Sequence, residues 1–189
     1  MSDFDERIPG ISTPERDEYK KIEKRLSSEG WENAQKYGVM ENQLIDGFII
    51  WPLFESVFKE INEILLKDLN EKEKNEIVSY VKDRLKSDDE KKILRYLKDG
   101  IEYMIPRISS KRKFRLIDYD NINNNKFIFA PQAKFEGSPE NSKPDFTLFV
   151  NGIPLAIIEV KPTTRIDSYI EALDQIKRYQ EQSPNLFRY

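Results

Sequence analysis

Three charged residues stand at the ends of two neighbouring apolar segments of this 189-residue chain. Asp145 begins the first segment, and Glu159 and Lys161 end the second. Glu159 and Lys161 are two positions apart, so on a strand their side chains lie on one face. Two carboxylates and a lysine at strand ends could hold Mg²⁺ through oxygen ligands and direct a water molecule at phosphorus. The same residues could instead form a surface ion pair at a strand terminus, which would contribute little to stability.

The residue inventory narrows the chemistry further. The sequence contains neither Cys nor His, which excludes disulfides, thiolate zinc sites, Ser-His-Asp triads and metals held by imidazole. Its seven glycines are not spaced as a G-x-G-x-x-G motif or a Walker A loop, so neither nucleotide-binding loop is encoded. Any catalysis must use carboxylates, Lys, Tyr, Ser or Thr, together with a hard metal such as Mg²⁺.

Charge and hydropathy indicate the compartment and the partners. The 31 Lys and Arg residues and the 34 Asp and Glu residues leave a net charge of −3, so binding of nucleic acid would need a local basic patch. The N-terminus is acidic and has no apolar signal segment. The longest apolar stretch, near 48–54, is too short to span a bilayer. We expect a soluble cytoplasmic protein without a membrane partner.

One basic run stands out along the chain. It lies between 107 and 115 and includes Lys111, Arg112 and Lys113. These three side chains could contact phosphate groups of a nucleic acid. They could equally belong to a solvated loop, which is the common role of such a run.

Helical periodicity dominates the first hundred residues. A leader over 1–14 precedes a first core helix region over 15–39. Thr13-Pro14-Glu15, at the boundary of the two, begins a helix, and Gly30 ends it. Residues 40–100 are predicted to form a helical insertion. Within it, Asn70 and Glu73 resemble a capping box, and Asp88 or Asp89 begins the last helix before Gly100.

Strand periodicity follows over 101–189, the predicted core. Strands are expected over 113–118, 127–129, 145–150 and 153–160, followed by a helix over about 166–182. The last two strands are apolar on both faces, which is typical of central strands covered by helices. The fold class is therefore α/β or α+β, with a central mixed sheet flanked by helices.

The turn between the last two strands constrains the site. Asn151-Gly152 predicts a hairpin. A two-residue loop with a regular ladder would pair Asp145 with Ile158 and point Asp145 away from Glu159. We therefore expect a three-residue loop with Gly152 in the left-handed conformation, a G1 bulge that pairs Asp145 with Ile157. A bend at Pro144 would be the alternative.

The spacing Asp145-x13-Glu159-x-Lys161 resembles the PD-(D/E)xK nuclease motif. The surrounding segment, 143–161, is similar to the nuclease domain of the R (motor) subunit of type I restriction enzymes. Two further segments, 115–121 and 172–179, also resemble this family, and Gln175 and Tyr179 match its QxxxY element. The resemblance covers roughly 100–189 and implies a restriction-endonuclease-like core.

The resemblance is weaker over 15–31. Glu15 aligns with the acid that the family carries on its first helix, and Gly30-Trp31 matches the end of that helix. The family often has a second Glu where this chain has Tyr19, with Glu18 beside it. The first-helix acid is therefore either Glu15 or Glu18.

The resemblance also implies roles for the site residues. The implied ligands of Mg²⁺, which Mn²⁺ could replace, are Asp145, Glu159, the backbone carbonyl of Val160 and, as a further candidate, Glu15. Lys161 would orient or deprotonate the attacking water and offset charge on the phosphorane. Gln175 and Tyr179 would position the DNA backbone, although the spacing of Tyr179 also suits a core aromatic residue.

The implied function is the endonuclease domain of a type I restriction R subunit, which hydrolyses phosphodiester bonds of double-stranded DNA. Methyltransferase and specificity subunits would be its partners, and ATP would act only in the full-length protein. The chain would then be a fragment of a longer polypeptide that binds DNA weakly by itself. The alternatives are a stand-alone nuclease of the same superfamily, resolvase-like or repair-like, and a non-catalytic docking module in which the charged residues form a structural ion cluster.

Overall fold

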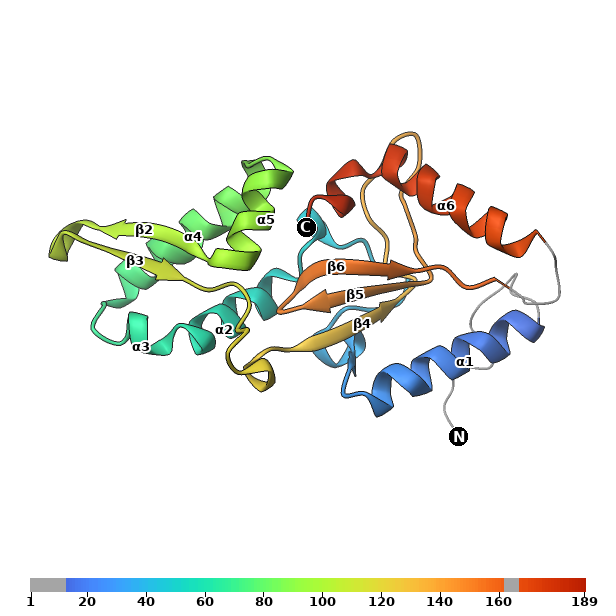
Figure 1. The fold of residues 1–189 in the computed structure, drawn as a ribbon, viewed down its shortest axis with the longest axis horizontal. Coiled ribbons are helices and arrows are strands. Elements are labelled where there is room, and N and C mark those ends of the chain that lie inside the picture. Colours follow the sequence, from blue (N-terminus) through green and yellow to red (C-terminus); the bar gives the residue numbers. More distant parts are fainter. Residues whose placement is uncertain (1–12, 162–166) are drawn as a thin grey trace.

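A computed structural model of the chain describes residues 13–161 and 167–189, with side chains from residue 16 onward (Figure 1). Most of the predicted leader, 1–14, lies outside these ranges. None of the described helices combines the length and the apolar character that a membrane-spanning segment requires. The architecture is mixed α and β, as predicted, with a sheet between helices.

The central sheet has four described strands in the order β1-β4-β5-β6. Their bounds are Glu32–Asn33 for β1, Phe127–Pro131 for β4, Phe146–Val150 for β5 and Ile153–Ile158 for β6. β1 runs parallel to β4 and the other neighbours are antiparallel, so the sheet is mixed, as expected. The prediction that β6 is central was wrong, because β6 forms an edge of the described sheet. Its apolar pattern reflects packing on its faces and does not reveal how many strand neighbours it has.

Helices cover both faces of this sheet. On one face, α1 (Thr13–Ser28) packs against β4 and β5. The buried residues of that layer are Tyr19, Leu26, Phe129, Phe146 and Val160. On the other face, Ile128 and Phe149 pack with Leu53 and Val57 of α2 (Trp51–Ile61). The predicted first helix is thus confirmed, and α1 lies directly against the strand that follows Asp145.

Residues 40–100, predicted as a helical insertion, contain four α-helices. After α2 come α3 (Glu63–Leu66), α4 (Glu71–Ser87) and α5 (Glu90–Asp99). The capping box of Asn70 and Glu73 is present, and Asp89 is the residue that caps α5. Both results confirm the helix starts predicted from capping residues.

A two-stranded hairpin follows these helices and packs with them. β2 (Ile101–Ile105) and β3 (Ser110–Phe114) pair antiparallel, and Ile101, Ile105 and Phe114 join the core of α4 and α5. The strand expected over 113–118 was misplaced, since Leu116 and Ile117 are buried in a loop rather than paired. The prediction also missed β2, although its alternation of buried and exposed residues is visible in the sequence.

The chain ends in α6 (Ser168–Gln182) and a short 3-10 helix, Pro184–Phe187. The predicted last helix is confirmed over its described part. Ile170 and Leu173 of this helix are exposed, whereas Tyr179 is buried. In Figure 1, α1 and α6 lie at one end of the molecule and the β2–β3 hairpin at the other.

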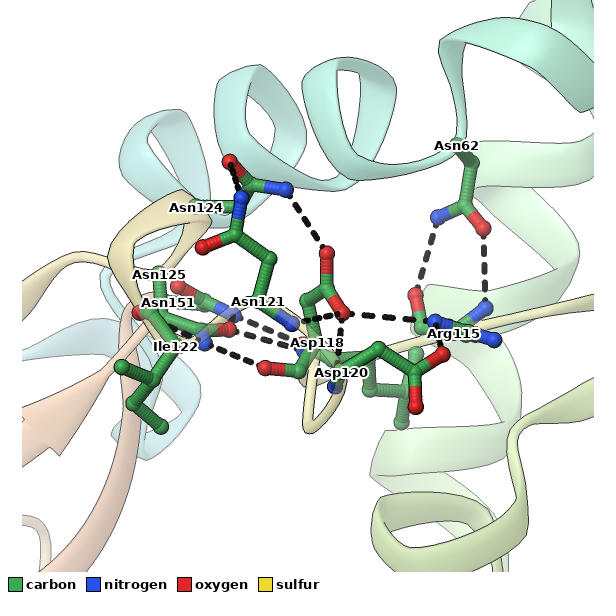
Figure 2. A network of polar contacts seen from close by, with 10 residues as sticks. Asn62, Arg115, Asp118, Asp120, Asn121, Ile122, Asn124, Asn125 and Asn151 are labelled. Carbon is green, nitrogen blue, oxygen red and sulfur yellow. Dashed lines mark hydrogen bonds and ion pairs between the residues drawn. The ribbon is translucent and has the colours of Figure 1, made fainter.

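A polar network joins the closed end of the β5–β6 hairpin to the loop that follows β3 (Figure 2). The buried side chain of Asn151 donates to the carbonyl of Leu116 at 2.9 Å and to Oδ1 of Asn125 at 2.8 Å, and it accepts from the N–H of Lys126 at 2.8 Å. Asn125 in turn bonds the backbone of Asp118. These bonds hold the loop that follows β3 against the hairpin turn.

The start of α2 closes over the same turn. The N–H of Ile50 donates to the carbonyl of Gly152 at 2.9 Å. A Cβ at position 152 would lie 2.7 Å from the carbonyl oxygen of Ile50, so only glycine fits this close approach. With its closed end fixed in this way, the hairpin presents its open end, where Asp145 and Glu159 stand, near α1 and α6.

Candidate active site

The register of the β5–β6 hairpin brings the two acids together. Val150 pairs with Ile153, and Asn151 and Gly152 have φ values of 53° and 84°, as in the two-residue turns that Asn-Gly favours. The predicted three-residue loop was therefore wrong. Asn151-Gly152 adopts the two-residue turn that this dipeptide prefers. The shift in strand register that brings Asp145 to the side of Glu159 therefore occurs elsewhere in the hairpin.

A bulge within β6 makes that adjustment. Phe149 pairs with Pro154, but Leu148 pairs with Ala156, which leaves Leu155 as an extra residue. Phe146 consequently pairs with Ile158, and continuing that register one step outward sets Asp145 opposite Glu159. Residues directly opposite one another share a face, so the bulge achieves the shared face that the turn was expected to provide.

Hydrogen bonds fix the carboxylate of Asp145 at this strand end. Its Oδ2 accepts from the N–H of Val160 at 2.7 Å. Its Oδ1 accepts from the hydroxyl of Tyr19 and lies 3.5 Å from Nε2 of Gln132. The N–H of Asp145 donates to Oε1 of Glu159 at 3.3 Å. The Glu159 carboxylate is thus bonded to the backbone of Asp145.

The carboxyl group of Glu159 is buried and incompletely hydrogen-bonded. Its side chain is 1% exposed, and its Oε2 is buried without a hydrogen-bond donor among the described residues. Nζ of Lys161 lies 3.8 Å away. Burial, and then the negative charge of Asp145, raises the pKa of the Glu159 carboxyl to about 7, against the opposing effect of Lys161. A bound cation would oppose both effects, because a nearby positive charge favours the ionised carboxylate.

Lys161 is held by the two residues of the QxxxY element. Its Nζ donates to Oε1 of Gln175 at 2.7 Å. Nε2 of Gln175 donates to the hydroxyl of Tyr179 at 2.6 Å, and that hydroxyl donates to the carbonyl of Lys143 at 2.9 Å. Gln175 and Tyr179 are one helical turn apart on α6, which places both on the same side of the helix. The structure brings them to Lys161, and their contact with DNA stays a prediction.

The structure does not bring every sequence candidate to this place. Glu15 lies in the first turn of α1, but its side chain is outside the described residues. The three basic candidates lie on β3 at the far end of the molecule (Figure 1). One of them, Arg112, makes two hydrogen bonds to Asp68, at 2.6 and 2.7 Å. Its guanidinium is therefore engaged within the protein.

Two contacts of Asp145 were not anticipated. Tyr19 was noted only as a departure from the family pattern, and Gln132 was not a candidate. Both are buried beside Asp145. Tyr19 comes from α1 and Gln132 follows β4, so the spacing of the β5–β6 hairpin residues could not have indicated either of them.

The donor set suits a hard divalent cation. No cluster of three or more His, Cys, Asp or Glu side chains occurs among the described residues, which leaves the carboxylates of Asp145 and Glu159. Mg²⁺ is commonly held by one or two carboxylates while it keeps several waters. The buried Oε2 of Glu159, which has no hydrogen-bond donor among the described residues, is the atom that a cation would satisfy.

Comparison with known proteins identifies the family. A family model described as the type I restriction enzyme R protein N terminus matches residues 13–189. A Methanocaldococcus jannaschii protein named as a candidate type I restriction enzyme endonuclease subunit, MjaVIIIP, is 37% identical over 175 residues. The HindI endonuclease subunit of Haemophilus influenzae is 29% identical over 179 residues. These matches cover 89% and 87% of this chain, respectively, and 16% of each relative.

A second M. jannaschii protein, named as the candidate endonuclease subunit MjaVIIP, is 55% identical over 94 residues, which is 50% of this chain and 9% of that protein. The chain thus spans about a sixth, or less, of the length of these relatives. The family match extends from α1 through the carboxylate hairpin to the end of α6, and it confirms the resemblance carried by 143–161. The chain belongs to the family of type I restriction enzyme R protein N-termini.

Proposed function

We propose that this chain is the Mg²⁺-dependent endonuclease domain of a type I restriction enzyme and hydrolyses phosphodiester bonds of double-stranded DNA. The observation that carries the proposal is the contact between Asp145 and Glu159, with one buried carboxylate oxygen of Glu159 lacking a donor among the described residues. The names of the relatives, which are endonuclease subunits of type I restriction enzymes, support the same class of reaction.

The carboxylates of Asp145 and Glu159, with the backbone carbonyl of Val160, would hold Mg²⁺, and Mn²⁺ could replace it. When bound, such a cation activates water and stabilises charge on a phosphoryl group. Lys161 has three N–H donors, and one of them is directed to Gln175. The other two make no hydrogen bond among the described residues and would serve the attacking water or a phosphate oxygen, where the ammonium group would offset the negative charge of the transition state.

A non-catalytic docking module is less well supported. A structural ion cluster would satisfy its buried oxygens internally, because an unpaired buried carboxylate oxygen is destabilising. Within the part of the chain that the structure describes, Oε2 of Glu159 has no hydrogen-bond donor and makes a long contact to Nζ of Lys161, at 3.8 Å. The family match likewise favours a restriction subunit over a stand-alone repair or resolvase-like nuclease.

The test uses the full-length R subunit assembled with methyltransferase and specificity subunits, with plasmid DNA, Mg²⁺ and ATP. We expect Glu159→Gln and Lys161→Met each to reduce DNA cleavage by about 100-fold or more, in the range seen when a group that stabilises transition-state charge is removed. ATP hydrolysis should continue, which would show that the assembly is intact. Lys177→Met is the matched control, since Lys177 is an exposed lysine of α6 paired only with Asp174 among the described contacts. Cleavage at the wild-type rate by Glu159→Gln would contradict the proposal.

A further inference from the structure

We propose that Tyr19 and Gln132 form a positioning pair that orients the carboxylate of Asp145 for a divalent cation. The inference rests on the proposed function and assigns roles to two residues outside the PD-(D/E)xK and QxxxY motifs. Neither residue is placed to touch the reacting atoms, and both act through Asp145.

Tyr19 has its hydroxyl oriented by two partners. The hydroxyl accepts a hydrogen bond from Nε2 of Gln132 at 2.9 Å and donates its own proton to Oδ1 of Asp145. A phenol has one donor, so the amide on one side and the carboxylate on the other fix its direction. The ring is 6% exposed and packs on Phe146, the neighbour of Asp145, with centroids 4.8 Å apart.

Gln132 is held by its backbone as well as by its amide. Its φ is 50°, in the left-handed region that is unfavourable for residues other than glycine. Its N–H donates to the carbonyl of Asp145 at 3.0 Å, and its carbonyl accepts from the N–H of Asn42 at 3.2 Å. These bonds hold the strained turn at the end of β4, beside the Tyr19 hydroxyl. The direct distance from Nε2 to Oδ1 of Asp145 is 3.5 Å, so Gln132 acts mainly through Tyr19.

Both oxygens of Asp145 therefore have a fixed donor. Tyr19 serves Oδ1, and the N–H of Val160 serves Oδ2. A carboxylate has about four acceptor positions, so each oxygen keeps one for a cation while the plane of the group is fixed. Groups that orient a metal ligand in this way commonly affect metal affinity by about 10- to 100-fold.

The experiment measures Mn²⁺ binding to the 189-residue chain from the electron paramagnetic resonance signal of free Mn²⁺. Tyr19→Phe removes the hydroxyl and keeps the ring that packs on Phe146. Tyr96→Phe is the matched control, because the Tyr96 hydroxyl also donates to an aspartate, Asp88, at 2.7 Å but belongs to α5. We expect Tyr19→Phe to raise the Kd for Mn²⁺ by about 10-fold and Tyr96→Phe to leave it unchanged.

Gln132→Gly removes the amide and tolerates the left-handed backbone. It should weaken Mn²⁺ binding less than Tyr19→Phe does, and it should have little further effect in the Tyr19→Phe background, because both changes break one chain of contacts. An unchanged Kd in a folded Tyr19→Phe variant would overturn the positioning pair alone. A wild-type chain that binds no Mn²⁺ would overturn the proposed cation site, and the pair with it.

Discussion

The backbone N–H of Val160 donates a hydrogen bond to Oδ2 of Asp145 at 2.7 Å. This bond ties the end of β6 to the start of β5 and holds the Asp145 carboxylate beside Glu159. The negative charge of Asp145 acts on the Glu159 carboxyl, and a bound cation would offset the repulsion between the two ionised groups.

Metal binding should stabilise the chain through Asp145. Mg²⁺ or Mn²⁺ is expected to raise the melting temperature of the wild type, because a ligand of the folded state adds about 2.7 kcal/mol at a concentration 100 times its Kd. Asp145→Asn should abolish the rise, since it removes one of the two ligand charges. Thermal unfolding with and without millimolar metal measures the effect. Asp68→Asn, which alters an exposed aspartate paired with Arg112, should keep the rise, and an equal rise in Asp145→Asn would argue against the site.

Stability without metal should depend on pH through Glu159. Its folded-state pKa of about 7 exceeds the ordinary value of about 4.3, so the protonated form favours folding. That stabilisation is complete below about pH 4.3 and is lost as the pH rises through 7. Glu159→Gln cannot ionise, so its free energy of unfolding relative to the wild type should increase between pH 5 and pH 8, by up to a few kcal/mol. Urea unfolding in EDTA measures this difference, and a difference independent of pH would show that the Glu159 carboxyl does not titrate with a raised pKa.

The bulge at Leu155 leads to a prediction about register. Deleting Leu155 removes the extra residue but leaves Asp145 opposite Glu159, so the metal-dependent rise in melting temperature should persist. Deleting Thr147 of β5 instead shifts Asp145 opposite Ile158, and the rise should disappear. The pair of deletions distinguishes this register from a regular ladder. Loss of the rise in the Leu155 deletion, in a chain that still folds, would be inconsistent with the bulge.

The hydrogen bonds between the β5–β6 turn and the loop that follows β3 should contribute to the stability of the fold. Asn151→Ala removes three hydrogen bonds of a buried side chain and places alanine at a φ of 53° (Figure 2). We expect a loss of about 3 kcal/mol in the free energy of unfolding, since each lost hydrogen bond costs about 1 kcal/mol. Asn121→Ala, at an exposed position of the loop that follows β3, should cost less than half as much. Chemical denaturation measures both, and equal losses would mean that Asn151 has no special role.

The sequence predicted the residues of the candidate site better than it predicted the backbone features and contacts that position them. The spacing of Asp145, Glu159 and Lys161 and the helical spacing of Gln175 and Tyr179 depend on local geometry, so they were visible in the chain. The bulge at Leu155 was not, because an apolar residue at an edge strand has no sequence mark of being extra.

The contacts that Tyr19 and Gln132 make with Asp145 could not be predicted from the sequence, for a different reason. Tyr19 lies 126 residues from Asp145, and the left-handed backbone of Gln132 carries no signal comparable to glycine. Capping residues gave the helix starts correctly because Asn70 and Asp89 bond within their own first turns. β3 was misplaced because its consecutive basic residues obscured its alternation of buried and exposed positions.

The most direct test of the central claim is the anomalous scattering of Mn²⁺ in crystals of this chain grown with millimolar MnCl₂. We predict an anomalous difference peak between the carboxylates of Asp145 and Glu159, and its disappearance in crystals of Asp145→Asn. Density for Mn²⁺ only at other surface acids, or no peak between these two carboxylates, would contradict the assignment of this hairpin end as a metal-dependent nuclease site.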